Sequence, residues 1–267
     1  MKIRKTGTKI KTFLFAALTL AVVTAVFLFF TNKYFFKVKN IEIDENEKYT
    51  YDEILKASGI TPGVELYAVD AKQTEKNIRE LLPYTKTVSV KRIPPSTVSI
   101  NIETAAGLFG INLGGDYYII SDKFKILDKI KVIGRENAEL EFSPPEGIIT
   151  FDTDTIKKCY LGEKIEFFDN DIYNFLEEIV LLREGNEKAF SRINCIDVKN
   201  KFKVSMNYEN KFIVNFGIFE NISSKILNSF EIINRLPDYA EGIIDMTDDK
   251  AASFTYEENV FMLYKSD

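Results

Sequence analysis

The stretch VSVKRIPPSTVSINIE, residues Val88 to Glu103, contains two alternating runs on either side of a double proline. The apolar positions of these runs alternate with polar ones and are Val88, Val90, Val98, Ile100 and Ile102. This alternation predicts a β-hairpin with one apolar face and one polar face. Because an isolated hairpin is marginally stable in water, other elements must cover its apolar face.

The residues before the hairpin predict that cover. A strand is expected over about 36–44, and a helix follows, with Thr50 and Glu53 as a capping box and Gly59 as its C-terminal stop. A second helix is expected between an Asp70 cap and Pro83. The apolar faces of the two helices would comprise Ile54, Leu55, Ala57, Ile78, Leu81 and Leu82. The order strand, helix, helix, strand, strand predicts a two-layer α+β domain over residues 33–104.

The N-terminal segment has the features of a membrane anchor. Residues 12–32 carry no charge over 21 positions, which as a helix would span roughly 30 Å, the thickness of a bilayer core. Residues 1–11 contain five basic side chains and no acidic one, which predicts a cytoplasmic tail. No small-x-small cleavage site follows, so we expect a retained transmembrane helix, with the rest of the chain outside the cytoplasm.

Composition argues against several classes of function. The chain has no histidine, so the most common general base and metal ligand is missing. Its two cysteines, Cys159 and Cys195, are too few for a zinc site but could form one disulfide outside the cytoplasm. After residue 32 there are 30 basic and 40 acidic residues, an acidic balance that disfavours nucleic acid. We expect no cofactor and no metal.

The remaining residues, 105–267, predict a larger domain. Three short strands are expected within residues 107–130, and two or three more within residues 193–217. Amphipathic helices are expected within residues 169–185 and 221–237, and two final strands at GIIDM and AASFTY. No element is assigned over residues 131–146. This pattern predicts a mostly antiparallel β domain with two or more helices.

Several of these segments resemble the FtsQ/DivIB cell-division family. The resemblance rests on VKNIEI, ASGITPGVELYAVD and VSVKRIPPSTVSINIETAAGLFGI behind an anchor, and on VNFG, a helix and GIIDMTDDKAASF near the end. It implies a POTRA domain over 33–104 and a family-type β domain over 105–267. It also implies a single-pass type II protein of the bacterial cell membrane, acting at the septum as a non-catalytic divisome scaffold.

The last strand is the candidate partner site. If it forms a sheet edge, its unpaired backbone groups can accept a strand from another chain. The resemblance implies FtsB/DivIC-like and FtsL-like bitopic partners here, and through them an indirect effect on the septal peptidoglycan synthase. The candidate partner-binding residues are Ile244, Asp245, Ala251, Ala252, Ser253, Phe254, Thr255 and Tyr256.

Three alternatives remain open from the residues. The POTRA pattern also occurs in translocation accessories, although such a protein would continue into a large β-barrel. An anchored cell-wall enzyme would use Asp152 and Asp154 as a catalytic pair, whereas closely spaced carboxylates in a turn are more often only solvated. A generic extracellular sensor stalk is the third alternative.

Overall fold

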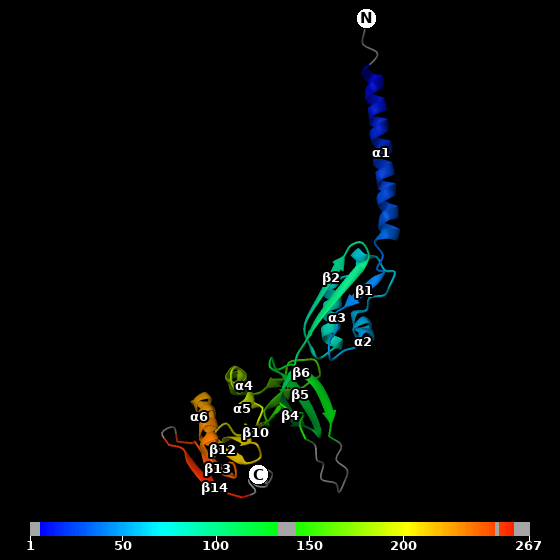
Figure 1. The fold of residues 1–267 in the computed structure, drawn as a ribbon. Coiled ribbons are helices and arrows are strands. Elements are labelled where there is room, and N and C mark those ends of the chain that lie inside the picture. Colours follow the sequence, from blue (N-terminus) through cyan, green and yellow to red (C-terminus); the bar gives the residue numbers. More distant parts are fainter. Residues whose placement is uncertain (1–5, 133–142, 249–250, 259–267) are drawn as a thin grey trace. The chain divides into compact units, whose positions relative to one another are not determined.

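The computed structural model describes residues 6–132, 143–248 and 251–258, and these form two compact units, 1–104 and 105–267 (Figure 1). The chain begins with helix α1, Thr6–Phe35, whose side chains are described at residues 12–27 and at Phe35. Within these described parts of the chain, no helix combines the length and the apolar character required to cross a membrane. The 131–146 segment, left unassigned from the sequence, lies largely outside the described residues.

The first unit continues with a three-stranded sheet and two helices. Strand order is β1-β3-β2, with β1 parallel to β3 and β2 antiparallel to it. The elements are β1 (Asn40–Ile43), α2 (Tyr51–Ser58), the 3-10 turn η1 (Leu66–Ala68), α3 (Ala71–Leu81), β2 (Thr85–Ile93) and β3 (Thr97–Thr104). The predicted order of strand, helix, helix, strand, strand is therefore confirmed. The first strand is shorter than expected, because residues 36–38 bond to the segment near Val64 instead.

Local signals fixed the helix ends as predicted. The Thr50 side chain accepts a bond from the Glu53 amide, and the Glu53 carboxylate accepts one from the Thr50 amide, which completes the capping box. Gly59 adopts the left-handed conformation at φ 68°, which favours glycine. The helices cover the apolar hairpin face through a core that includes Ile54, Ile78, Val88, Val90, Val98, Ile100 and Ile102. Leu81 was wrongly assigned to this core: it is 65% exposed, while Leu82 is buried.

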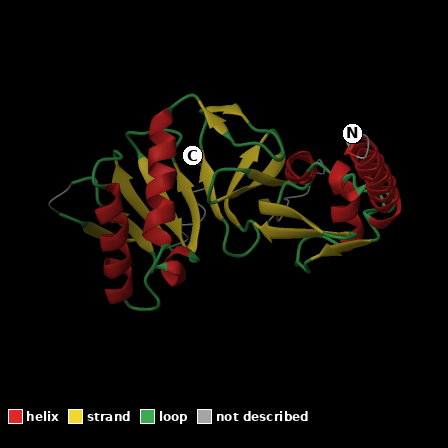
Figure 2. Ribbon diagram, turned by 90° about the horizontal axis from the view of Figure 1, so that it is seen from above, coloured by secondary structure: helices red, strands yellow, loops and turns green. Residues whose placement is uncertain are grey.

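The second unit is built on a mixed nine-stranded sheet (Figure 2). Its strand order is β14-β13-β12-β11-β10-β7-β4-β5-β6. The strands are β4 (Gly107–Leu113), β5 (Asp116–Ser121), β6 (Ile126–Lys131), β7 (Ile149–Asp152), β10 (Ile193–Asp197), β11 (Val204–Tyr208), β12 (Phe212–Gly217), β13 (Gly242–Asp245) and β14 (Ser253–Tyr256). Among the described strands, β7 runs parallel to β4 and β10, and β13 runs parallel to β12.

Helices pack on one face of this sheet. They are α4 (Asn170–Arg183), the short α5 (Glu187–Phe190) and α6 (Ile222–Arg235), and the two long ones were predicted. Their buried side chains, among them Phe175, Leu176, Ile226 and Phe230, join one core with the inward strand residues Phe109, Phe151, Met206 and Val214. Burial of this apolar area is the main stabilising contribution to the unit.

The sequence did not predict the central strand β7 or the small β8–β9 ribbon. β7 has four residues, and its neighbours β4 and β10 are about forty residues away in either direction along the chain. β8 (Ile156–Lys158) and β9 (Glu166–Phe167) are shorter still. Runs this short carry little periodicity, so only their pairing identifies them as strands.

Candidate partner-binding edge

The last strand, β14, lies at one edge of the nine-stranded sheet. Among the described residues it pairs with β13 alone, in an antiparallel register that places Gly242 opposite Tyr256 and Ile244 opposite Phe254. An edge strand presents a row of unpaired N–H and C=O groups on its outer side. β14 can therefore accept a further strand.

The register decides which backbone groups face outward. The Glu257 amide donates to the Glu241 carbonyl at 3.1 Å, so this pair is hydrogen-bonded across the ladder. In an antiparallel ladder hydrogen-bonded and non-hydrogen-bonded pairs alternate, which makes Thr255 and Ser253 the other residues of β14 bonded to β13. The N–H and C=O groups of Phe254 and Tyr256 consequently point to the open edge.

The side chains of β14 anchor the strand on one face and leave the rest accessible. Phe254 is half-buried against the main core, with its ring 6.4 Å from that of Phe212. Ile244, opposite it on β13, is fully buried. Ser253, Thr255 and Tyr256 are exposed, Tyr256 to 55%. The strand is thus held by Phe254 while its backbone edge and an aromatic side chain remain available.

Asp245 ends β13 and shapes the connection that follows. Its carboxylate accepts bonds from the Thr247 amide at 2.9 Å and the Thr247 hydroxyl at 2.7 Å. These bonds hold the pKa of the Asp245 carboxyl below its usual range. This side chain is therefore engaged in a turn within its own chain.

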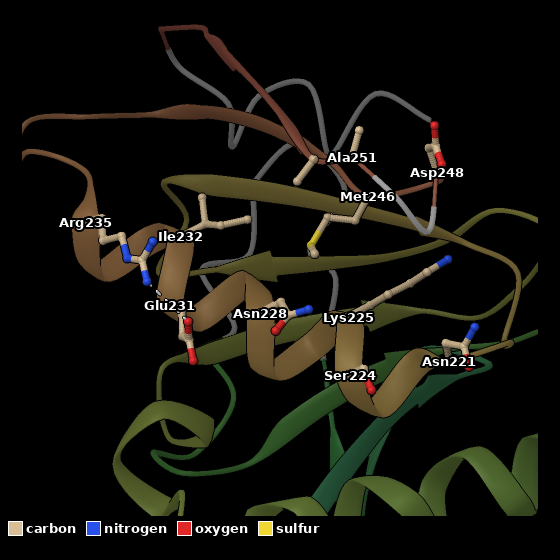
Figure 3. Close-up of a pocket in the computed structure, with 11 residues that line it drawn as sticks. Asn221, Ser224, Lys225, Asn228, Glu231, Ile232, Arg235, Met246, Asp248 and Ala251 are labelled. Carbon is tan, nitrogen blue, oxygen red and sulfur yellow. Dashed lines mark hydrogen bonds and ion pairs between the residues drawn. The ribbon is translucent and has the colours of Figure 1, made fainter.

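A depression of about 430 Å³ lies between α6 and the connection from β13 to β14 (Figure 3). Lys225 and Asn228 line it from α6, Asn221 lines it just before that helix, and Met246 and Ala251 line it from the connection. Lys225 is buried, and its ammonium donates to the Phe216 carbonyl at 3.0 Å. The depression thus borders the residues that lead directly into β14.

The predicted site residues fall into two groups. Ile244 and Asp245 lie in β13, and Ser253, Phe254, Thr255 and Tyr256 form β14, so these six are brought together by strand pairing. Ala251 and Ala252 precede β14, line the depression and are exposed. Their binding role remains a prediction.

Sequence reasoning missed Gly242, which lets β14 approach. A Cβ added at this glycine would lie 2.1 Å from the Thr255 carbonyl oxygen, far inside the contact limit. A single glycine at the start of a strand gives no sequence signal for such an approach, because the partner becomes known only when β13 and β14 are paired. The buried Lys225 was missed because its acceptor, the Phe216 carbonyl in β12, becomes known only when α6 is packed on the sheet.

The carboxylates considered for catalysis do not form a reactive cleft. Asp152 ends β7, with one oxygen 3.8 Å from the Cys195 sulfur and 3.8 Å from the Lys199 ammonium. Burial raises the pKa of the Asp152 carboxyl, which the Lys199 charge partly offsets. Asp154 follows in an exposed bend, and Cys159 and Cys195 are not joined in a disulfide. The part of the chain that is described contains no group of three or more potential metal ligands.

Comparison with known proteins shows which family this chain is similar to. The FtsQ-type POTRA domain profile matches residues 36–103. Cell division protein DivIB of Clostridium tetani is 24% identical over 201 residues, which cover 74% of this chain and 70% of that protein. The chain is therefore similar to the FtsQ/DivIB family, through an FtsQ-type POTRA domain at residues 36–103 and DivIB relatives over most of its length. Cell division protein FtsQ of Corynebacterium glutamicum is 32% identical over 115 residues, 40% of this chain and 51% of that protein. DivIB of Macrococcus caseolyticus is 35% identical over 92 residues, which cover 34% of this chain and 31% of that protein.

This similarity to the FtsQ/DivIB family confirms the resemblance derived from the sequence. It identifies residues 36–103 as a POTRA domain and the protein as a non-catalytic cell-division protein. It also implies a place in the membrane at the division site. The similarity to non-catalytic division proteins disfavours the cell-wall enzyme suggested by Asp152 and Asp154, and Asp152 lies at the end of β7.

Proposed function

We propose that this FtsQ/DivIB protein is a single-pass type II scaffold of the divisome that captures bitopic partners outside the cytoplasm. Residues 1–11 would remain cytoplasmic and residues 12–32 would cross the membrane. The POTRA domain, 33–104, would engage division partners near the membrane, and the β domain, 105–267, would bind FtsB/DivIC-like and FtsL-like chains. The complex would regulate septal peptidoglycan synthesis without performing the chemistry.

The outward backbone of β14 is the observation that carries this proposal. Phe254 and Tyr256 present N–H and C=O groups to an open edge, and Phe254 fixes the strand on the core. A strand from a partner can complete this ladder, which supplies main-chain hydrogen bonds for affinity and side-chain pockets for specificity. Asp245 would contribute by shaping the turn and not by direct contact.

A proline pair tests the edge directly. Tyr256→Pro removes an outward N–H and leaves the bonds to β13, a position where edge strands tolerate proline. We expect binding of the DivIC-like partner from the same organism to weaken about tenfold or more, because a strand hydrogen bond is lost and the ring blocks the ladder. The measurement is calorimetric titration of the full chain in nanodiscs, with the melting temperature recorded alongside.

Two control variants separate the contribution of the outward backbone N–H to binding from that of the Tyr256 side chain and from a loss of stability. Thr255→Pro removes an inward N–H, so we expect it to release β14 from β13 and lower both stability and binding. Tyr256→Ala keeps the outward N–H, so its affinity measures how much the Tyr256 ring alone contributes to partner binding. Unchanged affinity in Tyr256→Pro would overturn strand addition at this edge.

The cellular role has its own test. Depletion of the protein in its native cell should produce filaments that lack septa while peptidoglycan synthesis along the side wall continues. Septation at the normal rate after depletion would refute a role in the divisome, whatever the outcome at β14.

A further inference from the structure

Helix α1 joins the POTRA domain without a linker. Phe35 is the last residue of α1, and Phe36 already packs against the POTRA core. The Leu66 amide donates to the Phe36 carbonyl at 2.7 Å, and the Val38 amide donates to the Val64 carbonyl at 2.8 Å. Phe35 and Phe36 are consecutive residues, so their Cα atoms are about 3.8 Å apart and no linker separates the helix from the folded domain.

An exposed group of aromatic, aliphatic and basic side chains lies where this junction meets the domain. We call it the aromatic–basic rim, and it consists of Phe35, Lys39, Tyr67, Lys91, Arg92 and Ile93. Phe35 is 59% exposed, Tyr67 56% and Ile93 44%. Large apolar side chains gathered in this way on a surface mark a binding site.

Contacts tie together the segments that carry the rim. The Phe36 ring lies 5.8 Å from the Phe35 ring and 5.3 Å from the Tyr67 ring. The Arg92 guanidinium donates to the Tyr67 carbonyl at 3.2 Å, and the Lys39 amide donates to the Ser96 carbonyl at 2.8 Å. The helix end, the loop that contains Tyr67 and the tip of the β2–β3 hairpin are therefore tied together.

The charge of this end differs from that of the rest of the chain. Residues 35–39, 63–69 and 91–97 contain four basic side chains and one acidic side chain, Glu65. The chain after residue 32 is acidic overall. A basic surface that also carries Tyr and Phe matches the composition of a membrane interface with anionic headgroups.

The length of α1 places the rim at the level of the lipid headgroups. The uncharged stretch ends at residue 32, and α1 continues to Phe35 without interruption. At about 1.5 Å per residue, Phe36 lies roughly 6 Å beyond that stretch along the helix axis. The headgroup layer on each side of a bilayer is about 5–7 Å thick.

We propose that the aromatic–basic rim docks on the outer leaflet of the membrane, with Tyr67 and Ile93 in the interface and Lys91 and Arg92 on anionic lipid headgroups. This inference rests on the proposed membrane anchor. Docking would fix the POTRA domain at the bilayer surface and remove the freedom that a flexible tether would give it.

The chain contains no tryptophan, so one introduced indole reports its own surroundings without background. Tyr67→Trp places the probe in the rim. Leu81→Trp is the matched control in the same domain, since Leu81 is 65% exposed and ends α3 shortly before Thr85, which lies roughly 26 Å along β2 from Ile93. The full chain is reconstituted in vesicles of phosphatidylethanolamine and phosphatidylglycerol with shallow-brominated acyl chains.

We expect the indole at position 67 to be quenched at least twofold more by the brominated lipid than the indole at position 81, and to be shielded from iodide. Lys91→Glu in the Tyr67→Trp background should reduce lipid quenching, whereas Lys86→Glu at the far end of the same strand should not. Replacing phosphatidylglycerol by phosphatidylcholine should likewise weaken quenching.

The outcomes separate the rim from the anchor. If the chain floats with the vesicles but the two indoles respond alike to bromine and iodide, the rim does not dock. If quenching is the same without phosphatidylglycerol, recognition of anionic lipid is wrong. If the chain does not float with the vesicles at all, the proposed anchor fails, and the rim proposal fails with it.

Discussion

At the scale of single residues, Tyr117 shows how tightly the second unit is built. Its side chain is fully buried on the sheet, and its hydroxyl lies 2.9 Å from that of Thr150 on β7. The ring occupies the space above Gly110, where an added Cβ would come within 1.7 Å of the Tyr117 oxygen. One tyrosine therefore links β5, β4 and β7 in the middle of the sheet.

Burial of Tyr117 has a consequence at alkaline pH. Desolvation raises the pKa of its hydroxyl from 10.0 to about 12, although the Thr150 hydrogen bond opposes this shift. Between these values the unfolded chain loses a proton that the folded chain keeps, so folding stability is complete below pH 10 and declines as pH rises toward 12. The decline from this group is up to about 1.4 kcal/mol per pH unit.

We expect Tyr117→Phe to lose about 1 kcal/mol of unfolding free energy at pH 7, because the hydrogen bond to Thr150 is lost. Above pH 10 its stability should fall less steeply than that of the wild type. Urea unfolding from pH 8 to pH 11 measures both effects, and Tyr239→Phe at an exposed position is the control. Parallel profiles of stability against pH for wild type and Tyr117→Phe would contradict the raised pKa of Tyr117 in the folded protein.

At the scale of elements, the edge strand depends on a glycine in its neighbour. Gly242 on β13 allows β14 to lie against it, with no room for a Cβ beside the Thr255 carbonyl and the Phe254 ring. The rest of the sheet is held by larger residues on the helix-covered face. β14 is thus the part of the sheet that a small change can detach.

We expect Gly242→Ala to displace β14 and weaken partner binding at least tenfold, because the new Cβ must push away a backbone carbonyl. Amides of Ser253 and Thr255 should exchange faster with deuterium, while β10 to β12 remain protected. Hydrogen exchange read by mass spectrometry, together with partner titration, measures the change. Full protection and affinity in this variant would show that β14 tolerates the displacement or is not the docking strand.

At the scale of the whole molecule, the described residues form two separate hydrophobic cores. One lies beneath the POTRA sheet, with Ile100 fully buried, and the other lies between the nine-stranded sheet and its helices. Each core draws its buried side chains from a single unit, so each core stabilises its own unit.

We expect Ile100→Ala to destabilise the POTRA unit by about 2–5 kcal/mol, the usual cost of such a buried truncation. Residues 105–258 should keep their exchange protection and their partner affinity. Val214→Ala is the reciprocal variant in the second core, where it should leave residues 40–104 unaffected. Loss of protection in both units from either change would show that they unfold as one.

The sequence by itself determined the features that depend on near neighbours in the chain. The capping box at Thr50, the stop at Gly59, the apolar alternation from Val88 to Ile102 and the stripes of α4 and α6 are all short-range patterns. Each of these patterns is defined by a few neighbouring residues, whose periodicity indicates a helix or a strand. They sufficed for the POTRA order, the helix positions and the family resemblance.

Only the tertiary structure decided what depends on pairing between distant segments. It inserted β7 between β4 and β10, placed Leu81 outward, made β14 the edge beside Gly242 and brought Phe35, Tyr67 and Ile93 to one end of the POTRA unit. The physical reason is that strand register and surface proximity are fixed by long-range hydrogen bonds and packing, for which no local periodicity exists.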